Sequence, residues 1–490
     1  MTTDIEALKA SYKAAGQDHV FTFWDKLSKD QQDALVAQLV EFDPSEISTI
    51  AKDTIESFTK LTSGSAAPED SSVEPLPESA TFSLLDSSKE QQDKYFAQGL
   101  ELIAANKVAV ILLAGGQGTR LGSSAPKGCY DVLLPSHKSL FQLQGERIER
   151  LQNLAQAKAA TSSTKVAIPW YIMTSGPTRK PTEEFFEKNN YFGLDKANVF
   201  FFEQGVLPCL TTDGKIILES AGKVAVAPDG NGGFYKALVK AGVIADLEKR
   251  GIEHVHTYCV DNCLVKVADP LFIGWAADLK LEVGTKVVRK RDAAESVGLI
   301  VAKNGAPAVI EYSEISKDLV GLPDSADPSI LKFRAANIVN HYYSVPYLQS
   351  IPSWPASVLP YHVAHKKIPY IDLATGVEDP KPTKPNGIKL EQFIFDVFPA
   401  LSLSKGQFGS MEVHRSQEFS PLKNAPGSKE DSPETSREHL LAQSKGWLEA
   451  VGATFPNSET VVEVSPLTSY GGEGLEKFKG TVFDKPEYII

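Results

Sequence analysis

The sequence predicts an α/β protein: a Rossmann-like, doubly wound mixed sheet with a helical N-terminal region and a small β-rich C-terminal domain. Three observations support this fold class. From about residue 105, short apolar runs alternate with helical segments, which is typical of repeated βα units. The run VAVILL at 108–113 carries no charge, as expected of a strand buried on both faces of a parallel sheet. Before residue 60 the apolar spacing is helical.

Residues 5–60 have apolar side chains at helical spacing, such as Phe21, Trp24 and Leu27, with charged residues between them. We predict that they form a small helical cap or an oligomer surface. The stretch SGSAAPEDSSVEPLPE at 63–78 is rich in Ser, Pro and Glu, and this composition is typical of a linker. The first predicted domain is therefore a helical region with its linker, residues 1–104.

The central part of the chain, residues 105–428, is predicted as a second domain built from alternating strands and helices. Strands are expected at 108–113, 170–175, 198–204 and 254–262, and helices at 139–158 and 234–251. Ligands of such sheets bind beyond the carboxyl ends of the strands, so loops that follow these runs are candidate site segments.

The sequence pattern changes after residue 285. Short runs between 286 and 315, KVVRK, GLIVA and APAVIEYSEI, predict an antiparallel insert at the sheet edge. Polar, proline-rich stretches at 374–387 and 424–438 predict surface loops, the second a hinge. A helix near 436–450 and two β-prone runs, ETVVEVS and KGTVF, make up a small C-terminal domain, residues 429–490.

The chain has 490 residues and a net charge of −12, so non-specific attraction to nucleic acid or to an anionic membrane is not expected. An anionic substrate must then be held by local cations. The first residues lack a basic and apolar leader, and no apolar run approaches the ~20 residues that span a bilayer. The four cysteines form no C-x-x-C pair and suit a reducing compartment. We expect a cytoplasmic protein.

The segment LAGGQGTRLG at 113–122 follows the first central strand directly. Gly115, Gly116 and Gly118 let the backbone turn tightly and approach a ligand, because no Cβ shields the amides. Arg120 and Lys127 add positive charge at the same loop. This combination predicts a cradle for a polyphosphate.

Other interpretations of this loop are weaker. A Walker loop needs G-x-x-x-x-G-K-[ST], which the segment lacks. Gly116, Gly118 and Gly122 match a G-x-G-x-x-x-G variant of the dinucleotide fingerprint. Against a dehydrogenase, no tyrosine is followed by a lysine four residues later, and no acidic residue stands about 20 positions on to hold a ribose. A purely structural glycine turn stays open as an alternative.

Two further loops combine polar residues with strand or helix ends. APDGNGG at 227–233 precedes a helix, and Asn231 could recognise hydroxyls there, although a simple tight turn would have the same spelling. Asp261, in VDN, closes a strand at the carboxyl edge. A single carboxylate beside phosphate groups can hold Mg²⁺, but many strands end in an Asp that only caps the backbone.

Polar residues inside apolar runs form the last candidates. Glu311 in VIEYSEI and Asn337 in RAANIVNH need partners, which sugar hydroxyls or internal hydrogen bonds could supply. Lys423, in EFSPLKN, has no acidic residue in the next four positions, and its alternative role is that of an ordinary surface lysine.

Taken together, these motifs resemble those of the eukaryotic UDP-N-acetylhexosamine pyrophosphorylases. The resemblance rests on their order along the chain: LAGGQGTRLG, PKG, FFEQGVLP at 201–208, APDGNGG, VDN and SPLKN. It covers roughly residues 100–430. The related UDP-glucose pyrophosphorylases have Leu-Gly where this loop has Gln-Gly. The resemblance implies a fold of the nucleotidyltransferase type, with residues 105–428 as the catalytic domain.

The resemblance also implies roles for individual residues. Arg120 and Lys127 would grip the triphosphate, Lys423 would reach the reacting phosphates, and Asp261 would hold Mg²⁺. The uracil would be held by Leu113, Ala114, Gly115, Gly116, Gln204 and Gly230. The sugar would be held by Asn231, Gly298, Glu311 and Asn337, with Phe393 and Phe395 as a wall around its acetamide.

The implied reaction joins UTP and N-acetylglucosamine 1-phosphate into UDP-N-acetylglucosamine and pyrophosphate. The attacking phosphate is already anionic at pH 7, so positioning and charge stabilisation carry the rate. A broad-specificity UDP-sugar pyrophosphorylase is an alternative. A catalytically silent nucleotide-sugar binding module is disfavoured, because all four charged residues, Arg120, Lys127, Asp261 and Lys423, are present. We expect a monomer or weak homo-oligomer.

Overall fold

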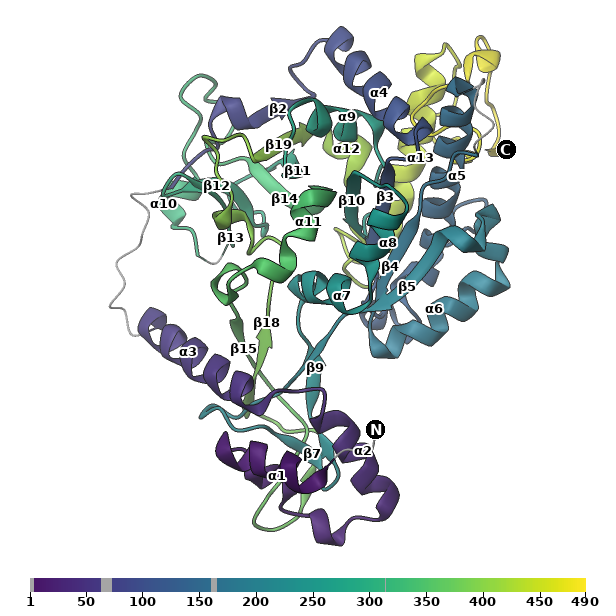
Figure 1. The fold of residues 1–490 in the computed structure, drawn as a ribbon. Helices are drawn as coiled ribbons and strands as arrows, with labels where there is room; N and C mark the ends of the chain where they lie inside the picture. Colours follow the sequence, from purple (N-terminus) through teal and green to yellow (C-terminus); the bar gives the residue numbers. More distant parts are fainter. Residues whose placement is uncertain (1–3, 63–72, 160–164, 313) are drawn as a thin grey trace. The chain divides into compact units, whose positions relative to one another are not determined.

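The computed structural model describes residues 4–62, 73–159, 165–312 and 314–490 (Figure 1). It divides the chain into two compact units. Unit 1 comprises Met1–Glu69, Gln204–Lys236 and Pro355–Val397, and unit 2 comprises Asp70–Glu203, Ala237–Trp354 and Phe398–Ile490. These units do not coincide with the three consecutive domains predicted from the sequence. The chain between 105 and 428 contributes to both units, because apolar contacts join segments that are distant in sequence. Of the predicted linker, residues 63–72 lie outside the described residues.

Unit 2 is built on a large mixed sheet. The described strands along its path are, in order, β2 (Thr81–Ser83), β19 (Phe408–Val413), β11 (Val283–Arg289), β14 (Ala335–Ser344), β10 (His254–Cys259), β3 (Val108–Leu113), β4 (Trp170–Thr174) and β5 (Val199–Glu203). The predicted strands correspond to β3, β4, β5 and β10, which are mutually parallel. Along this path β14 is antiparallel to both of its neighbours. The α/β class and the mixed sheet are therefore confirmed.

The predicted antiparallel insert is only partly correct. β12 (Leu299–Lys303) and β13 (Ala306–Ile310) form an antiparallel hairpin that pairs with β14, and the short β1 (Val73–Glu74) pairs with β12. KVVRK, however, lies in β11, which belongs to the main sheet and runs parallel to β19. The local pattern could not distinguish the two cases, because β11 enters the main sheet by pairing with β14 and with the distant β19.

Helices cover both faces of the sheet. Trp170 and Ile172 of β4 pack into a core shared with α4 (Lys89–Ala104), α5 (Leu140–Lys158) and α6 (Gly176–Lys188). The intervening Tyr171 donates a hydrogen bond from its hydroxyl to Asp246 of α8 (Val243–Lys249) on the other face, at 2.7 Å. Because successive residues of β4 contact helices on opposite faces, the sheet has the doubly wound arrangement. α5 lies where the helix at 139–158 was predicted.

One helix interface in unit 2 depends on glycine. α4 lies across α9 (Pro270–Asp278), as Figure 1 shows. A Cβ on Gly99 would lie 1.8 Å from the carbonyl oxygen of Pro270, and one on Gly274 would lie 2.0 Å from that of Tyr95. The two backbones therefore approach as closely as they do only because these positions lack side chains.

The predicted helix at 234–251 is two helices. α7 (Phe234–Lys240) ends before Gly242, whose φ of +70° caps the start of α8. The left-handed conformation breaks the helix, and glycine adopts it at no steric cost. The shorter helices of unit 2 are α10 (Lys317–Val320), α11 (Val345–Gln349) and α12 (Arg415–Glu418).

Unit 1 combines the N-terminal helices with small sheets from later in the chain. The helices are α1 (Ile5–Ala14), α2 (Lys29–Leu39) and α3 (Pro44–Thr62), as predicted for residues 5–60. The strand pairs are β6 (Val206–Pro208) with β9 (Val226–Pro228), β7 (Leu218–Ser220) with β8 (Lys223–Val224), β15 (His362–Lys366) with β18 (Gly387–Glu391), and β16 (Tyr370–Ile371) with β17 (Glu378–Asp379). Tyr12, Leu35 and Leu39 pack with Leu218 and Ile388 in one core. The helical region is thus the apolar cover of these sheets.

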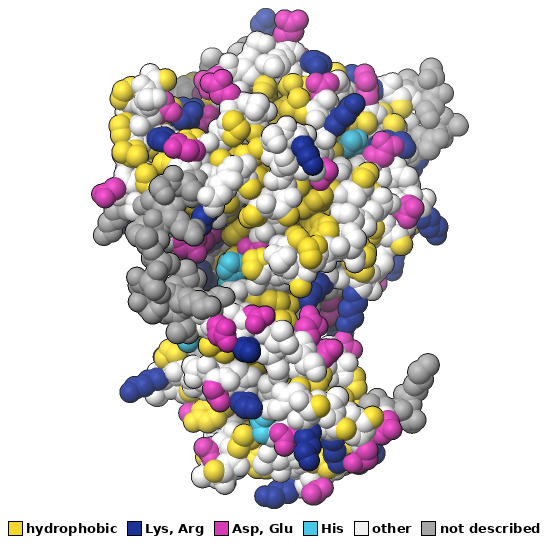
Figure 2. Space-filling view, turned by 60° about the vertical axis from the view of Figure 1, so that its left-hand side comes forward, with side chains coloured by type: hydrophobic (Ala, Val, Ile, Leu, Met, Phe, Trp, Pro, Cys, Tyr) yellow, Lys and Arg dark blue, Asp and Glu magenta, His cyan; other side chains and the backbone are white. Residues whose placement is uncertain are grey.

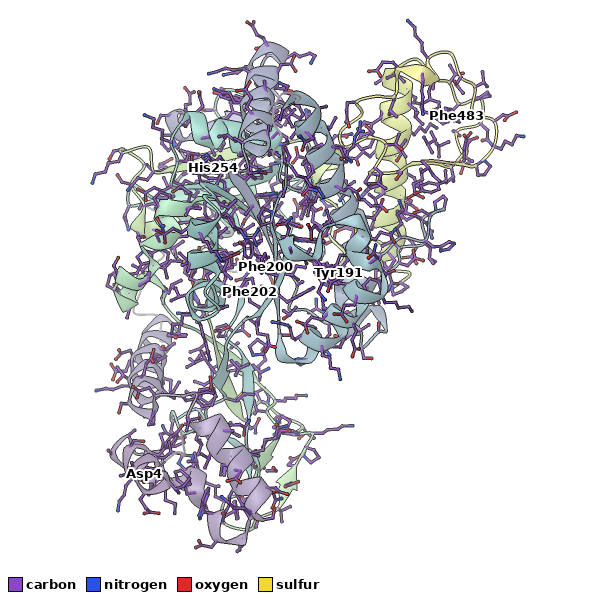
Figure 3. All side chains as sticks on the ribbon, turned by 45° about the vertical axis from the view of Figure 1, so that its right-hand side comes forward. Asp4, Tyr191, Phe200, Phe202, His254 and Phe483 are labelled. Atoms are coloured by element: carbon purple, nitrogen blue, oxygen red, sulfur yellow. The ribbon has the colours of Figure 1, made fainter. Side chains whose placement is uncertain are left out.

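The C-terminal segment begins with α13 (Pro433–Ala450), so the predicted hinge loop ends earlier than expected. β20 (Val462–Val464) lies in the predicted run ETVVEVS and pairs in parallel with β21 (Glu487–Ile489). The run KGTVF is not a strand and contributes only an isolated bridge from Val482 to Thr454. Its Phe483 instead packs against Phe455 and Phe478 (Figure 3).

The surface carries charges of both signs. On the face drawn in Figure 2, acidic and basic side chains are interspersed with polar and apolar ones. None of the described helices combines the length and the apolar character that crossing a bilayer requires.

Candidate active site

The glycine-rich loop leaves β3 at the carboxyl edge of the sheet. The carbonyl of Leu113 accepts from Val260 at 3.1 Å, and the amide of Ala114 donates to the carbonyl of Met173 at 2.8 Å. The hydroxyl of Ser175, at the start of α6, donates to the carbonyl of Gly115 at 2.7 Å. In the described structure the Ala114 carbonyl and the Gly115 amide have no protein partner, and neither does the amide of Gly116. The loop therefore presents one acceptor and two donors.

The second half of the loop folds back on itself. The amide of Gly118 donates to the carbonyl of Ala125 at 3.0 Å, and the amide of Lys127 donates to that of Gly116 at 3.1 Å. Gly122 ends a short 3₁₀ turn with a φ of +75°. This fold encloses a cavity of about 180 Å³ lined by Gln117, Gly118, Thr119, Arg120, Leu121, Lys127 and Lys423.

The cavity brings the three predicted cations together. Arg120 and Lys423 are exposed, and Lys127 is half-buried with its Nζ donating to the carbonyl of Leu422 at 3.1 Å. Lys423 comes from a segment almost 300 residues further along the chain, so the fold alone makes them neighbours. No ion pair within the described residues neutralises these cations. The cavity is therefore electropositive and suits a polyanion.

The strand-end segment with Asp261 pairs with the segment before Lys423. The amide of Leu422 donates to the carbonyl of Asp261 at 2.9 Å, and Asn262 and Pro421 form an antiparallel bridge. Burial raises the pKa of the nearby Cys259 thiol, the charge of Asp261 raises it further, and Lys423 and Lys127 oppose this effect. Asp261 thus lies at the same edge of the sheet as the cations.

The donor set at Asp261 fits a metal held mainly by a ligand's phosphates. In the part of the chain that the structure describes, the Asp261 carboxylate accepts no hydrogen bond, and no three His, Cys, Asp or Glu side chains cluster to form a metal site. A single free carboxylate with open positions around it is what Mg²⁺ needs when water and phosphate oxygens complete its shell.

Three predicted sugar residues also meet in unit 2, although each comes from a different segment. The amide of Asn337 donates to the carbonyl of Gly298 at 2.8 Å. A Cβ on Gly298 would lie 3.0 Å from Oε1 of Glu311, so the Glu311 carboxyl group lies close above this backbone. Because β14 is antiparallel to β10, its first residues lie at the carboxyl edge of β10. The three residues are therefore at the edge that holds Asp261.

Asn337 lies at a strained bulge of β14. Thr285 of β11 is opposite His341, but Val287 is opposite Asn337, so β14 carries extra residues here. Val339, within the bulge, has a φ of +50°, which is costly for a β-branched residue. Its amide donates to Oδ1 of Asn337 at 3.0 Å, which fixes the side-chain amide and leaves its NH₂ group available. Such bulges often re-aim side chains at functional sites.

In unit 1 the APDGNGG loop packs tightly against the segment after β18. The amide of Gly232 donates to the carbonyl of Gln392 at 2.8 Å, and Oδ1 of Asn231 accepts from the amide of Ile394 at 3.0 Å. A Cβ on Gly230, whose φ is +85°, would lie 2.3 Å from that Gln392 oxygen. The alternative interpretation, a tight turn into a helix, is therefore correct for the backbone of this loop. Asn231 still has a free NH₂ group.

The two phenylalanines predicted as an aromatic wall lie side by side in unit 1. The rings of Phe393 and Phe395 stack with centroids 5.2 Å apart, and His362 lies 4.7 Å from the ring of Phe393. Asp396 accepts from His362 at 3.0 Å and from the amide of Phe393 at 2.6 Å. Gln204 is half-buried next to Gly205, whose carbonyl accepts from the amide of Asp229 at 3.2 Å. Gln204 therefore lies beside the APDGNGG loop.

The predicted site residues fall into two groups. Unit 2 holds the loop residues 113–116, the three cations, Asp261, Gly298, Glu311 and Asn337, and unit 1 holds Gln204, Gly230, Asn231, Phe393 and Phe395. Gln117 and Thr119, which line the cavity beside Arg120, were not among the predicted site residues. Neither were Asn262 and Glu418, which fix the segment before Lys423. The sequence held one signal for Asn262. It directly follows Asp261, and its side-chain amide has both a donor and an acceptor with which it can join two loops.

Comparisons with known proteins identify the family of the chain. The family model described as UTP–glucose-1-phosphate uridylyltransferase matches residues 52–481. The chain is 49% identical to the UDP-N-acetylglucosamine pyrophosphorylase of Saccharomyces cerevisiae, over 98% of this chain and 99% of that one. It is 43% identical to the human UDP-N-acetylhexosamine pyrophosphorylase-like protein 1, over 98% and 96%.

A solved structure gives the same result for the fold. The uridine diphosphate N-acetylglucosamine pyrophosphorylase of Trypanosoma brucei, determined in complex with an inhibitor, aligns with a TM-score of 0.82 at 32% identity, over 97% of this chain and 95% of that one. Family model, whole-length relatives and fold thus all agree with the resemblance seen in the motifs. The chain belongs to the UTP–glucose-1-phosphate uridylyltransferase family, in its group of UDP-N-acetylglucosamine pyrophosphorylases.

Proposed function

We propose that this protein transfers the uridylyl group of UTP to N-acetylglucosamine 1-phosphate, forming UDP-N-acetylglucosamine and pyrophosphate. The observation that carries the proposal is the cavity in which Arg120, Lys127 and Lys423 meet, with no carboxylate among its lining residues. The yeast relative, 49% identical, is a UDP-N-acetylglucosamine pyrophosphorylase. A silent binding module would have no need for three uncompensated cations at the exit of the glycine loop.

The first loop suits the imide edge of uracil. That edge has an N–H donor between two carbonyl acceptors. The free Ala114 carbonyl can accept from the base, and the free amides of Gly115 and Gly116 can donate to its carbonyls. The carbonyl of Leu113 already accepts from the amide of Val260 and its side chain is buried, so its proposed role is to support the loop. In unit 1, Gln204 and Gly230 are the proposed uracil residues.

The cations act on the phosphates. Two unit charges 4 Å apart repel by ~4 kcal/mol at an effective dielectric of 20, and joining UTP with a sugar phosphate creates several such contacts. Arg120 and Lys127 hold the triphosphate as it gains charge, and Lys423 is placed to stabilise the reacting phosphates. We also propose Asp261 as the residue that would hold Mg²⁺, which when bound supplies further charge neutralisation between the phosphate groups.

No proton has to be removed for the attack. The phosphate of N-acetylglucosamine 1-phosphate is ionised at pH 7, so it attacks the α-phosphorus in line while pyrophosphate leaves. The residues of the cavity contribute orientation and electrostatics rather than acid–base chemistry. One phosphoanhydride replaces another, so the reaction runs in both directions.

The sugar is recognised through donors and an apolar wall. In unit 2 the free NH₂ of Asn337 can donate to the acetamide carbonyl, and Glu311 near Gly298 can accept from sugar hydroxyls. In unit 1, Asn231 offers a second NH₂ group, and the stacked Phe393 and Phe395 suit the acetamide methyl.

The described cysteines are all free, which supports a cytoplasmic location. For assembly we propose a monomer or weak homo-oligomer.

A sugar phosphate panel tests the proposal. Pyrophosphate release is measured on mixing the protein with UTP, Mg²⁺ and the 1-phosphates of N-acetylglucosamine, N-acetylgalactosamine and glucose. We expect N-acetylglucosamine 1-phosphate to be best and its galacto epimer to be slower. Glucose 1-phosphate should be weaker by ~10²-fold, because the acetamide partners stay unpaired. Equal turnover of glucose 1-phosphate would favour a broad-specificity enzyme, and no pyrophosphate with any sugar would refute the activity.

A further inference from the structure

A cluster of buried charges lies beneath the segment that carries Lys423. Lys286, on β11, is fully buried, and its Nζ donates to Oδ2 of Asp269 at 2.5 Å and to Oε2 of Glu418. Lys266 adds a second cation, 3.4 Å from Oε1 of Glu418. Asp269 and Glu418 are themselves 3% and 1% exposed. None of these four residues lines the cavity of the cations.

Two of these charges, Lys286 and Asp269, are stabilised in spite of their burial. Burial by itself lowers the pKa of Lys286, but Asp269 and Glu418 together raise that pKa above its ordinary value. Burial would likewise raise the pKa of Asp269, and Lys286 and Lys266 hold it below its usual range. Buried ion pairs are weak sources of stability, because desolvation offsets their attraction and apolar residues often do as well. The cluster therefore contributes little to stability, but it fixes the positions of the side chains that it joins.

Two of its members belong to the rigid framework. Lys286 lies in the middle of β11, between β14 and β19. Asp269 is the N-cap of α9, and its Oδ1 accepts from the amide of Leu271 at 3.1 Å. Because both residues are fixed by backbone hydrogen bonds, Lys286 offers Glu418 a stationary anchor.

Glu418 begins the segment that leads to Lys423. Its carbonyl accepts from Nδ2 of Asn262 at 2.7 Å, and Oδ1 of Asn262 accepts from the amide of Ser420 at 2.9 Å. Ser420 and Leu422 are buried, and Lys423 is the first exposed side chain after Glu418. The segment therefore leads from an anchored Glu418 to Lys423.

We propose that Glu418, anchored by Lys286, is a positioning residue that sets the place of Lys423 in the phosphate cavity. The inference rests on the proposed function of Lys423. Glu418 touches no substrate in this mechanism and acts through the chain it holds. A displacement of about 1 Å at a reacting group can cost ~10²-fold in rate, so even a small loss of anchoring is measurable.

A double-mutant cycle tests the proposal. Glu418→Gln keeps the shape of the side chain and removes its charge. In the otherwise unchanged protein it should lower kcat by about tenfold with less than about threefold change in the KM for UTP, because ground-state binding by Arg120 and Lys127 persists. In a Lys423→Ala background, Glu418→Gln should lower kcat by less than about twofold, because the residue through which it acts is gone.

The outcomes separate this proposal from the proposed function. An equal loss in both backgrounds would show that Glu418 acts independently of Lys423, and an unchanged kcat for Glu418→Gln alone would show that it positions nothing; either result overturns the inference. A normal kcat for Lys423→Ala alone would refute the proposed role of Lys423, and the inference with it. Because this result comes from Lys423→Ala and not from Glu418→Gln, it is distinguished from a failure of the inference alone.

A neutral variant and a matched ion pair complete the test. The triple change Lys286→Met, Asp269→Asn and Glu418→Gln leaves no unpaired buried charge, so it should fold and still show the reduced kcat; a normal kcat in this folded variant contradicts the proposal. Lys138 and Glu146 form another buried pair, with Nζ and Oε2 2.5 Å apart. Lys138→Met with Glu146→Gln should change the melting temperature comparably and leave kcat within about twofold.

Discussion

The two glycine-rich loops of this protein are similar in sequence but differ in the space beside their backbones. In LAGGQGTRLG, a Cβ on Gly116 or on Gly122 would meet no atom within 4 Å. In APDGNGG, a Cβ on Gly232 would lie 2.6 Å from the Gln392 carbonyl carbon, and one on Gly233 would lie 2.0 Å from Oδ1 of Asp229. The first loop keeps open space beside its backbone, and the second fills that space with protein.

This difference assigns different tasks to the same residue type. Open space beside free amides and unpaired cations is what a loop needs when a ligand is to lie against it. In the second loop, Gly232 and Gly233 permit the chain itself to pack, and ligand contact is left to Gly230 and to the Asn231 side chain. Changes in the first loop should therefore affect catalysis, and changes in the second should affect stability.

The largest expected effect is at the first loop. Arg120→Ala should lower kcat/KM by 10²–10³-fold, about 3–4 kcal/mol of transition-state stabilisation, the scale seen when one oriented donor is lost. The melting temperature should stay unchanged, because Arg120 is exposed and forms no ion pair within the described residues. Lys89→Ala, at an exposed cation of α4, is the control and should leave both quantities unchanged. Normal turnover of Arg120→Ala would remove the contrast between the loops.

Matched glycine substitutions test the contrast directly. Gly233→Ala should lower the free energy of unfolding by about 2–3 kcal/mol, because the new Cβ overlaps the Asp229 carboxyl group. Gly116→Ala should leave the melting temperature within about 1 °C and reduce the affinity for UTP, because the methyl group occupies ligand space. Thermal unfolding and UTP titration of both variants give the ranking, and a reversed ranking would contradict the assigned tasks.

The packed loop should also show a pH signature. Burial raises the pKa of Asp229 to about 6, its backbone hydrogen bond and Lys236 oppose this effect, and Oδ1 has no partner in the described structure. The folded state thus binds the proton more tightly than the unfolded one, whose pKa is ~3.9. The stability that this proton contributes is complete below pH ~4 and is lost as the pH rises through about 6.

Asp229→Asn removes this titration. Relative to the unchanged protein, the variant should be about 2 kcal/mol more stable at pH 7 and nearly equal at pH 4, because only the unchanged protein then carries a buried charge. Differences in the free energy of unfolding at the two pH values cancel the other titrations. A pH-independent difference would show that Asp229 is neutral or paired throughout.

The smallest expected effect concerns the side-chain amide of Asn231 in the packed loop. Asn231→Asp keeps the acceptor for the Ile394 amide and loses the NH₂ donor. The melting temperature should hold, and the KM for N-acetylglucosamine 1-phosphate should rise about tenfold, or ~1.4 kcal/mol. Asn304→Asp, in the exposed turn between β12 and β13, is the control. An unchanged KM would leave the packed loop with a structural task only.

Local pattern sufficed for the four neighbouring parallel strands of the main sheet. β3, β4, β5 and β10 are short, apolar and bounded by turns, and α5 has a helical period, so each could be predicted from its own residues. The errors occurred where distant pairing decides. β11 lies inside the main sheet because it pairs with β14 and also with β19, more than 100 residues later, whereas KGTVF forms only an isolated bridge.

The sequence by itself determined which residues can do the chemistry: a charge-free strand, a glycine loop, a few cations and a carboxylate at strand ends, in an order typical of one family. Only the tertiary structure decided which of these meet. Lys127 and Lys423 share a cavity because 420–422 pairs with 261–263, and Asn337 presents its NH₂ because a strained bulge holds its oxygen. Local propensity is written in neighbouring residues, whereas these contacts depend on how segments far apart in the sequence pack together.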